Sequence, residues 1–199
     1  MKPTIISGVL VMVVVVGLPL RGWAGPPTDA VKRLLESVRS YKKDPPVLSA
    51  RDRAANAQAQ KVVAETLMIP NLAKQVLGPQ WEKLNADQQK DFAQLLMELL
   101  EKVAYPKSAE FFGDLRIDYT NEKASGPEAV VETLVSHPKE GQVTIEYHLR
   151  QLNGKWTISD VLLDGVSLVT NLRTQMQQVI GKESYQGLVK RMRDKLAES

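Results

Sequence analysis

The spacing of apolar residues changes twice along this chain, and this change constrains the fold more than any other feature of the sequence. Between Leu115 and Leu163, apolar and polar residues alternate, which is typical of strands with one buried face. Before and after this segment, apolar residues recur every three or four positions, as on helices. Short turns divide the alternating segment into four strands, so one apolar sheet face must be covered. The pattern predicts an α+β fold in which N- and C-terminal helices cover a four-stranded twisted antiparallel sheet.

Turn residues mark the ends of these strands. Asn153-Gly154 is a strong signal for a two-residue hairpin between the last two strands. A further turn at Asp164-Gly165 ends the last strand, where Gly165 supplies backbone freedom. The strands are expected over residues 115–120, 129–136, 143–150 and 155–163.

Capping residues mark the starts of the helices. Asn85, with Gln88 at the third helical position, begins the helix with the widest apolar face. After the sheet, Ser167 can cap a helix that Gly181 should stop, and Ser184 can cap the last helix. Near the N-terminus, a helix that begins at Thr28 carries the stripe Val31, Leu34, Leu35, Val38 and Tyr41.

The first 24 residues differ in kind from the rest. A basic start at Lys2, an apolar run of about 16 residues and small residues before Ala24 are typical of a secretory signal peptide. A membrane-spanning helix needs about 20 apolar residues. We therefore expect residues 1–24 to be cleaved and residues 25–199 to form a single exported domain. Lys2 and Arg21 are two of the 26 basic residues, so the remaining chain is nearly neutral and gives no reason to expect nucleic acid binding.

No residue pattern in the chain predicts catalysis or metal binding. There is no cysteine, and neither histidine, His137 nor His148, has partners at ligand spacing. No glycine-rich loop follows a strand in the phosphate-binding pattern. Four carboxylates could supply a general acid and base, although we interpret them as solvated strand ends: Asp114, Asp118, Asp160 and Asp164. We therefore predict no catalytic residue, no metal and no cofactor.

Three segments resemble the MlaC family, also called toluene-tolerance auxiliary proteins. They are "VLGPQWEKLNADQQKDFAQLLMELLEKVAY" over residues 76–105, "ISDVLLDGVSLVTNLRTQM" over residues 158–176 and "SYQGLVKRMRDKL" over residues 184–196. The acidic-Gly-Val-Ser-Leu turn in the second segment is the most specific. The chain departs from the family at "MIPNLAKQ", where Ile69 and Asn71 stand in place of a common Phe-Asp pair. Membership of a hopanoid-associated branch of the same family is an alternative that stays open.

The resemblance implies a periplasmic carrier of glycerophospholipid, with acyl chains buried between the sheet and the helices. It implies transfer between an outer-membrane lipoprotein–porin complex and an inner-membrane ABC transporter with an MCE-type subunit. Bound lipid would be cargo, the chain would be a monomer and it would not be an enzyme. Transfer of two acyl tails, with about 30 methylenes, from water into an apolar environment is favourable by roughly 24 kcal/mol. A carrier must therefore offer a cavity that is about as apolar as the membrane.

On this interpretation, apolar residues of the long helix and the sheet form the cavity, although the same residues could pack as a solid core. The expected walls are Leu95, Leu99, Val103, Val131, Val135, Ile145, Tyr147 and Leu149, with Phe111, Phe112 and Trp156 at the ends. The expected rim is Val166, Leu168 and Leu172. Asp164, Ser167, Asn171 and Arg173 are expected to brace the turn after the sheet, or to face a head group or partner.

Two other classes of function stay open. An enzyme that acts on a small apolar substrate in a cone-shaped, NTF2-like sheet would place a carboxylate such as Asp118 or Glu146 inside the cavity. A chaperone would expose an open apolar groove and hold no defined lipid.

Overall fold

The computed structural model describes residues 26–42, 49–112, 115–137 and 141–198. The expected signal peptide lies outside these ranges, as do the side chains of residues 110, 111 and 137. Within them, no helix is both long enough and apolar enough to cross a membrane.

The strands form one antiparallel sheet in the order β1-β2-β3-β4-β5, which confirms the predicted meander and α+β class. The fifth strand was not predicted. It forms because Asp164 and Gly165 both have positive φ angles, 45° and 80°, which suits a two-residue hairpin turn. The strands are β1 Arg116–Ser125, β2 Glu128–His137, β3 Gly141–Leu152, β4 Lys155–Leu163 and β5 Val166–Ser167.

Helix α4 and both segments of α6 begin where the capping residues predicted, whereas α1 begins at Pro27, ahead of the expected start at Thr28, whose side chain binds Glu122 instead. Asn85 and Gln88 form a reciprocal capping box at the start of α4, and the Ser49 side chain accepts from the Asp52 backbone N–H at the start of α2. The helices are α1 Pro27–Ser40, α2 Ala50–Leu67, α3 Ile69–Leu77, the 3₁₀ helix η1 Gly78–Lys83, α4 Ala86–Leu99, the π-helical turn η2 Leu100–Ala104, α5 Tyr105–Phe112 and α6 Leu168–Ala197.

Helix α6 consists of two segments that meet at Ser184. The backbone angles of this residue, φ 75° and ψ 171°, are not helical. Its hydroxyl oxygen accepts a 3.4 Å hydrogen bond from the Gly187 backbone N–H, as a cap of the second segment would. The sequence correctly predicted this cap, but the first segment continues past Gly181 up to the kink.

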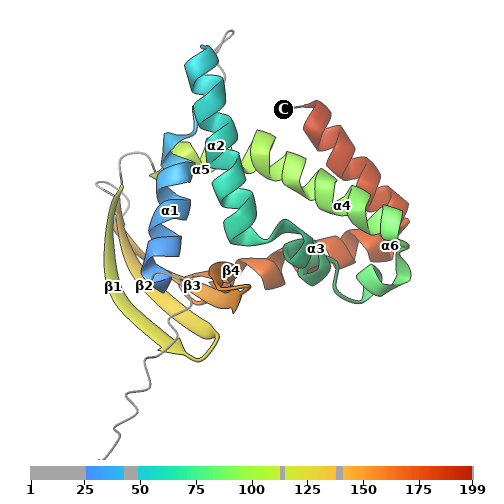
Figure 1. Ribbon diagram of the computed structural model, residues 1–199. Helices are drawn as coiled ribbons and strands as arrows, with labels where there is room; N and C mark the ends of the chain where they lie inside the picture. Colours follow the sequence, from blue (N-terminus) through green and yellow to red (C-terminus); the bar gives the residue numbers. More distant parts are fainter. Residues whose placement is uncertain (1–25, 43–48, 113–114, 138–140, 199) are drawn as a thin grey trace, which may run out of the picture.

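The sheet and α1 share one apolar core, which we call the sheet cluster. Figure 1 shows α1 lying across one face of the curved sheet, and α1 contacts β1, β2 and β4. The stripe of α1 packs on the inward side chains of the strands because alternation places those side chains on one face. The sheet cluster includes the buried residues Val31, Leu34, Leu35, Val38, Val63, Tyr105, Val131, Val135, Ile145, Tyr147 and Leu149.

A second core, the helical cluster, lies between α3, α4 and α6. In Figure 1, α4 and the C-terminal half of α6 extend away from the sheet. The apolar face of α4 packs here, with Phe92, Leu95 and Leu96 buried. Among the described residues, Leu100 is the one side chain that packs against both clusters.

Candidate functional site

An apolar cavity of about 460 Å³ lies between the sheet and the helices. Helices α1 and α2, the turn η2, α5, strands β3 and β4 and the start of α6 all contribute to it. Lys107 and Ser108 are the polar side chains at its edge, and no carboxylate or histidine is among its described lining residues. The lining is Leu34, Leu35, Val38, Val63, Leu67, Leu100, Ala104, Tyr105, Lys107, Ser108, Phe112, Ile145, Tyr147, Val161, Leu163 and Leu168.

Two tyrosines in this lining carry buried hydroxyl groups. Tyr105 begins α5 and is 4% exposed, and Tyr147 lies on β3 and is 2% exposed. Neither hydroxyl has a hydrogen-bond partner among the described residues. Burial raises the pKa of both phenol groups well above the usual range, because the charged form loses its hydration.

The structure places the expected wall residues in three different environments. Phe112, Ile145 and Tyr147 line the cavity. Val131, Val135 and Leu149 are buried in the sheet cluster, and Trp156 packs against it, but none of these four lines the cavity. Leu95 and Leu99 pack in the helical cluster instead, and Val103 is partly buried without lining the cavity. The Phe111 side chain lies outside the described residues.

Of the expected rim residues, Leu168 alone lines the cavity. Val166, Leu168 and Leu172 are 56%, 40% and 38% exposed, and neither Val166 nor Leu172 is among the lining residues. The lining residues that sequence analysis missed come from α1, α2, η2, α5 and β4. The helical stripe of Leu34, Leu35 and Val38 indicated that α1 is buried, but it did not indicate what α1 covers.

The residues around the last turn make hydrogen bonds within the protein. The Asp164 carboxylate accepts from the Thr144 backbone N–H at 3.0 Å. Ser167 caps α6 by accepting from the Thr170 backbone N–H at 3.0 Å. Asn171 is exposed and accepts from the Gln175 side chain at 2.6 Å.

Arg173 braces α3 rather than the turn at Asp164. Its Nε donates to the Gln75 carbonyl oxygen at 2.7 Å. Gln177, one helical turn later, donates to the Leu77 carbonyl oxygen at 2.6 Å. These two side chains therefore satisfy carbonyl groups that the end of α3 leaves without helical partners.

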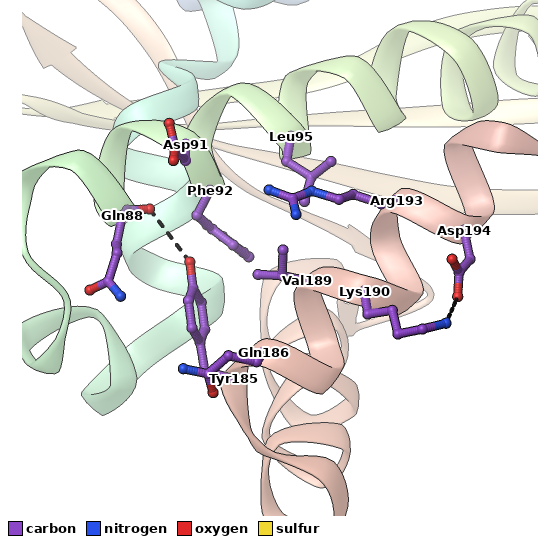
Figure 2. Close-up of a pocket in the computed structure, with 10 residues that line it drawn as sticks. All are labelled: Gln88, Asp91, Phe92, Leu95, Tyr185, Gln186, Val189, Lys190, Arg193 and Asp194. Carbon is purple, nitrogen blue, oxygen red and sulfur yellow. Dashed lines mark hydrogen bonds and ion pairs between the residues drawn. The ribbon is translucent and has the colours of Figure 1, made fainter.

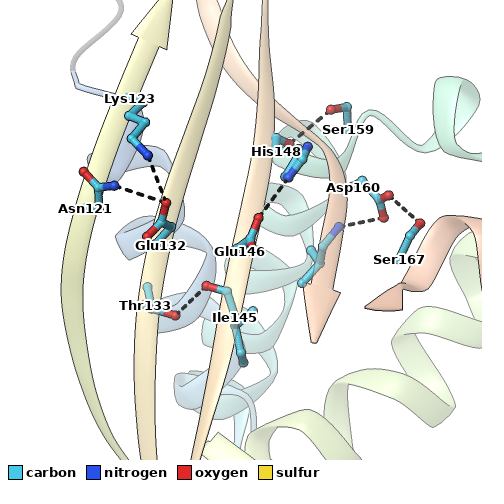
Figure 3. A network of polar contacts seen from close by, with 11 residues as sticks. Asn121, Lys123, Glu132, Thr133, Ile145, Glu146, His148, Ser159, Asp160 and Ser167 are labelled. Atoms are coloured by element: carbon cyan, nitrogen blue, oxygen red, sulfur yellow. Dashed lines mark hydrogen bonds and ion pairs between the residues drawn. The ribbon is translucent and has the colours of Figure 1, made fainter. Parts of the chain in front are cut away.

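Asp160 joins β4 to the start of α6, where sequence analysis had interpreted it as a solvated strand end. Figure 3 shows its carboxylate beside Ser167, whose hydroxyl donates to it at 2.5 Å. The backbone N–H groups of Val161 and Val169 also donate to it, at 2.8 Å and 3.2 Å. A carboxylate at this position stabilises the positive end of the helix dipole.

The other carboxylates of the sheet do not face the cavity. Glu146 lies 3.4 Å from the His148 ring, and Glu132 accepts from the Asn121 amide at 3.1 Å (Figure 3). Asp118 pairs with Arg116 at 3.0 Å. No group of His, Asp and Glu side chains in the described ranges is arranged to hold a metal ion.

A smaller groove of about 350 Å³ lies between α4 and the second segment of α6. Figure 2 shows Phe92, Leu95 and Val189 at its floor, with Asp91 and Arg193 beside them. The Tyr185 hydroxyl donates to the Gln88 carbonyl oxygen at 3.4 Å across it. The groove is lined by two acidic and two basic side chains, Asp91, Asp194, Lys190 and Arg193, so it favours neither charge.

The fold and the first cavity define an α+β protein with an apolar pocket between an antiparallel sheet and its covering helices. The chain belongs to the MlaC family, because the family model described as MlaC protein matches residues 29–194. The resemblance found in the sequence is thereby confirmed.

A solved structure shares this fold. It is the phospholipid-binding protein from Ralstonia solanacearum, in complex with a phospholipid. The likeness has a TM-score of 0.66 at 19% sequence identity and covers 87% of this chain and 98% of that chain. Among curated proteins, no sequence matches this chain.

Proposed function

We propose that this protein is a periplasmic carrier that holds a phospholipid with its acyl chains in the apolar cavity. The observation that carries the proposal is the cavity of about 460 Å³ between α1, α2 and the sheet. Its volume lies within the range of about 300–1,000 Å³ typical of ligand pockets. Membership of the MlaC family and the fold shared with a phospholipid-bound protein support the same conclusion.

The physical task of such a carrier explains the composition of this site. Two acyl tails in water cost roughly 24 kcal/mol relative to the bilayer, at about 0.8 kcal/mol for each methylene. A cavity lined by residues such as Leu34, Val63 and Ile145 offers the tails an environment similar to the bilayer. Transfer between membrane and carrier is then nearly balanced, and weak differences between partners set its direction.

We further propose that the carrier shuttles lipid between the outer membrane and an inner-membrane MCE/ABC transporter. The family supports these partners, a lipoprotein–porin complex on the outer-membrane side and a periplasmic location. Cleavage behind Ala24 is proposed from the residue pattern of positions 1–24. N-terminal sequencing of protein recovered from periplasm tests the cleavage, with Gly25 as the expected first residue. Transfer of labelled phospholipid to the reconstituted transporter tests the partner.

The cavity itself is tested by filling it. Ala104 lines the cavity at η2, whereas Ala93 is a partly buried alanine in the helical cluster. We expect Ala104→Phe to lower the phospholipid that copurifies with the protein at least fivefold, because the added ring occupies the space of the acyl chains. Ala93→Phe is the matched control and should retain wild-type lipid content. Native mass spectrometry measures the bound lipid, and circular dichroism verifies folding.

Two results would contradict the proposal. One is wild-type protein from periplasm that carries no extractable phospholipid and takes none up from vesicles. The other is a folded Ala104→Phe variant with unchanged lipid content.

A further inference from the structure

The two buried tyrosine hydroxyls in the cavity lining are unusual for an apolar wall. Buried polar side-chain atoms are nearly always hydrogen-bonded, and an exception in a native protein calls for an explanation. Within the described chain, the hydroxyls of Tyr105 and Tyr147 are the two buried side-chain polar atoms without a partner. They come from α5 and β3, and both residues line the same cavity.

The protein gives neither hydroxyl a hydrogen bond of ordinary geometry, although the Thr133 side chain lies near enough to the Tyr147 hydroxyl to interact with it. Thr133, on the strand beside Tyr147, donates its hydroxyl proton to the Ile145 carbonyl oxygen at 3.1 Å (Figure 3). Tyr105 meets the ring of Tyr41 edge-on, with 6.0 Å between ring centroids. A phenylalanine at either position would fill the wall equally well without burying an unpaired donor. The hydroxyls therefore indicate that a guest supplies the acceptor.

The lining also determines what kind of acceptor fits. Burial of a phosphate would require a cation beside it. Lys107 is the one cationic side chain in the described lining, and it is exposed at the cavity edge. A neutral acceptor is therefore favoured inside, and ester carbonyl oxygens are the neutral acceptors next to the acyl chains of a glycerophospholipid.

We propose that Tyr105 and Tyr147 donate hydrogen bonds to the ester carbonyl oxygens of the bound lipid and so select ester-linked acyl chains. This inference rests on the proposed function, because it concerns the same cavity. It distinguishes diacyl lipids from apolar guests without a carbonyl group, such as ether lipids and polycyclic hydrocarbons.

The experiment compares two lipids that differ in the carbonyl groups alone. The mature protein, which begins at Gly25, is incubated with vesicles that contain equal amounts of a diester phosphatidylethanolamine and its diether analogue, with the same chain length. Bound lipid is extracted and quantified by mass spectrometry. We expect wild type to enrich the diester at least fivefold, since one net hydrogen bond is worth about a factor of five. Tyr105→Phe and Tyr147→Phe should each reduce this ratio, and the double variant should bring it close to one.

Tyr185→Phe is the matched control. Its hydroxyl donates to Gln88 in the helical cluster, so the diester preference should equal that of wild type. A second measurement is the melting temperature of delipidated protein. We expect Tyr105→Phe and Tyr147→Phe to raise it or leave it unchanged, because each removes an unpaired buried donor.

The possible failures are distinguishable. If wild type binds both lipids equally, or if the double variant keeps the preference, the inference is wrong and the carrier function stands. If the Phe variants lower the melting temperature of delipidated protein, the hydroxyls have protein partners and the inference is also overturned. If wild type binds neither lipid, the proposed function and the inference fall together.

Discussion

At the scale of single residues, the most strained backbone position in the described ranges is Ser184. Its φ of 75° and ψ of 171° lie in a region that glycine alone adopts easily. We predict that Ser184→Gly raises the free energy of unfolding by about 1 kcal/mol, since relief of strain outweighs the loss of a few tenths of a kcal/mol from the weak cap. Urea denaturation measures it. Ser184→Ala is the control: it keeps the strain and loses the cap, so it should be less stable than wild type. A Ser184→Gly variant that is less stable than wild type would contradict the prediction.

The two cavity tyrosines predict how stability depends on alkaline pH. Burial raises the pKa of Tyr105 and Tyr147 in the folded state, whereas a tyrosine in the unfolded chain ionises near pH 10. The stability contributed by this shift is complete below about pH 10 and is lost as the pH rises above it, because the unfolded state then releases protons that the folded state retains. Denaturation at pH 9 and pH 11 should show a smaller loss for the Tyr105→Phe/Tyr147→Phe variant than for wild type. If both proteins lost the same amount of stability between pH 9 and pH 11, other titratable groups would determine the alkaline pH dependence.

At the scale of elements, Arg173 links α6 to the end of α3. Besides its hydrogen bond to Gln75, it packs on Gly78, where an added Cβ would lie 3.4 Å from the Arg173 Cδ atom. We predict that Arg173→Ala lowers the free energy of unfolding by about 1–2 kcal/mol, through the lost hydrogen bond and packing. Urea denaturation measures this, with Arg193→Ala in the exposed groove as the control. Unchanged stability together with lost lipid transfer would instead assign Arg173 to a partner.

Several elements could be predicted from the sequence because their signals are local. Alternation from Leu115 onward, Asn153-Gly154 and the Asn85–Gln88 capping box each concern residues within a few positions of one another. The two-residue strand β5 was missed because such a strand is shorter than any periodicity. The partner of α4 was also missed: the stripe that includes Leu95 predicts a buried face, but packing against α3 and α6 is decided by tertiary contacts.

The cavity could be predicted only in part. Ile145 and Tyr147 were expected in it because they lie on the inward face of a strand. Leu34 and Val63 lie far from them in sequence, and no local pattern indicates that these segments meet. Apolar periodicity is also the same for a solid core and for a hollow one, so the volume itself is not encoded in it.

At the scale of the whole molecule, the sheet cluster and the helical cluster are connected through the side chain of Leu100, which packs against both. Trp156 packs against the sheet cluster and Trp81 against the helical cluster, so each core has its own fluorescent reporter. We predict that Trp81→Phe and Trp156→Phe variants unfold at the same urea midpoint, as one cooperative unit. Leu100→Ala should lower stability by about 2 kcal/mol and separate the two midpoints. Leu163→Ala is the control, because this side chain packs against the sheet cluster alone. If the two tryptophan variants unfolded at different urea midpoints while Leu100 is intact, the prediction would be wrong.

The contacts of Asp160 have a consequence for how the cavity opens. They fasten the first turn of α6, and with it Leu168, to β4 through the side chain of Ser167 and the backbone of Val169. A guest that needs more room therefore cannot gain it by moving this turn unless these hydrogen bonds break.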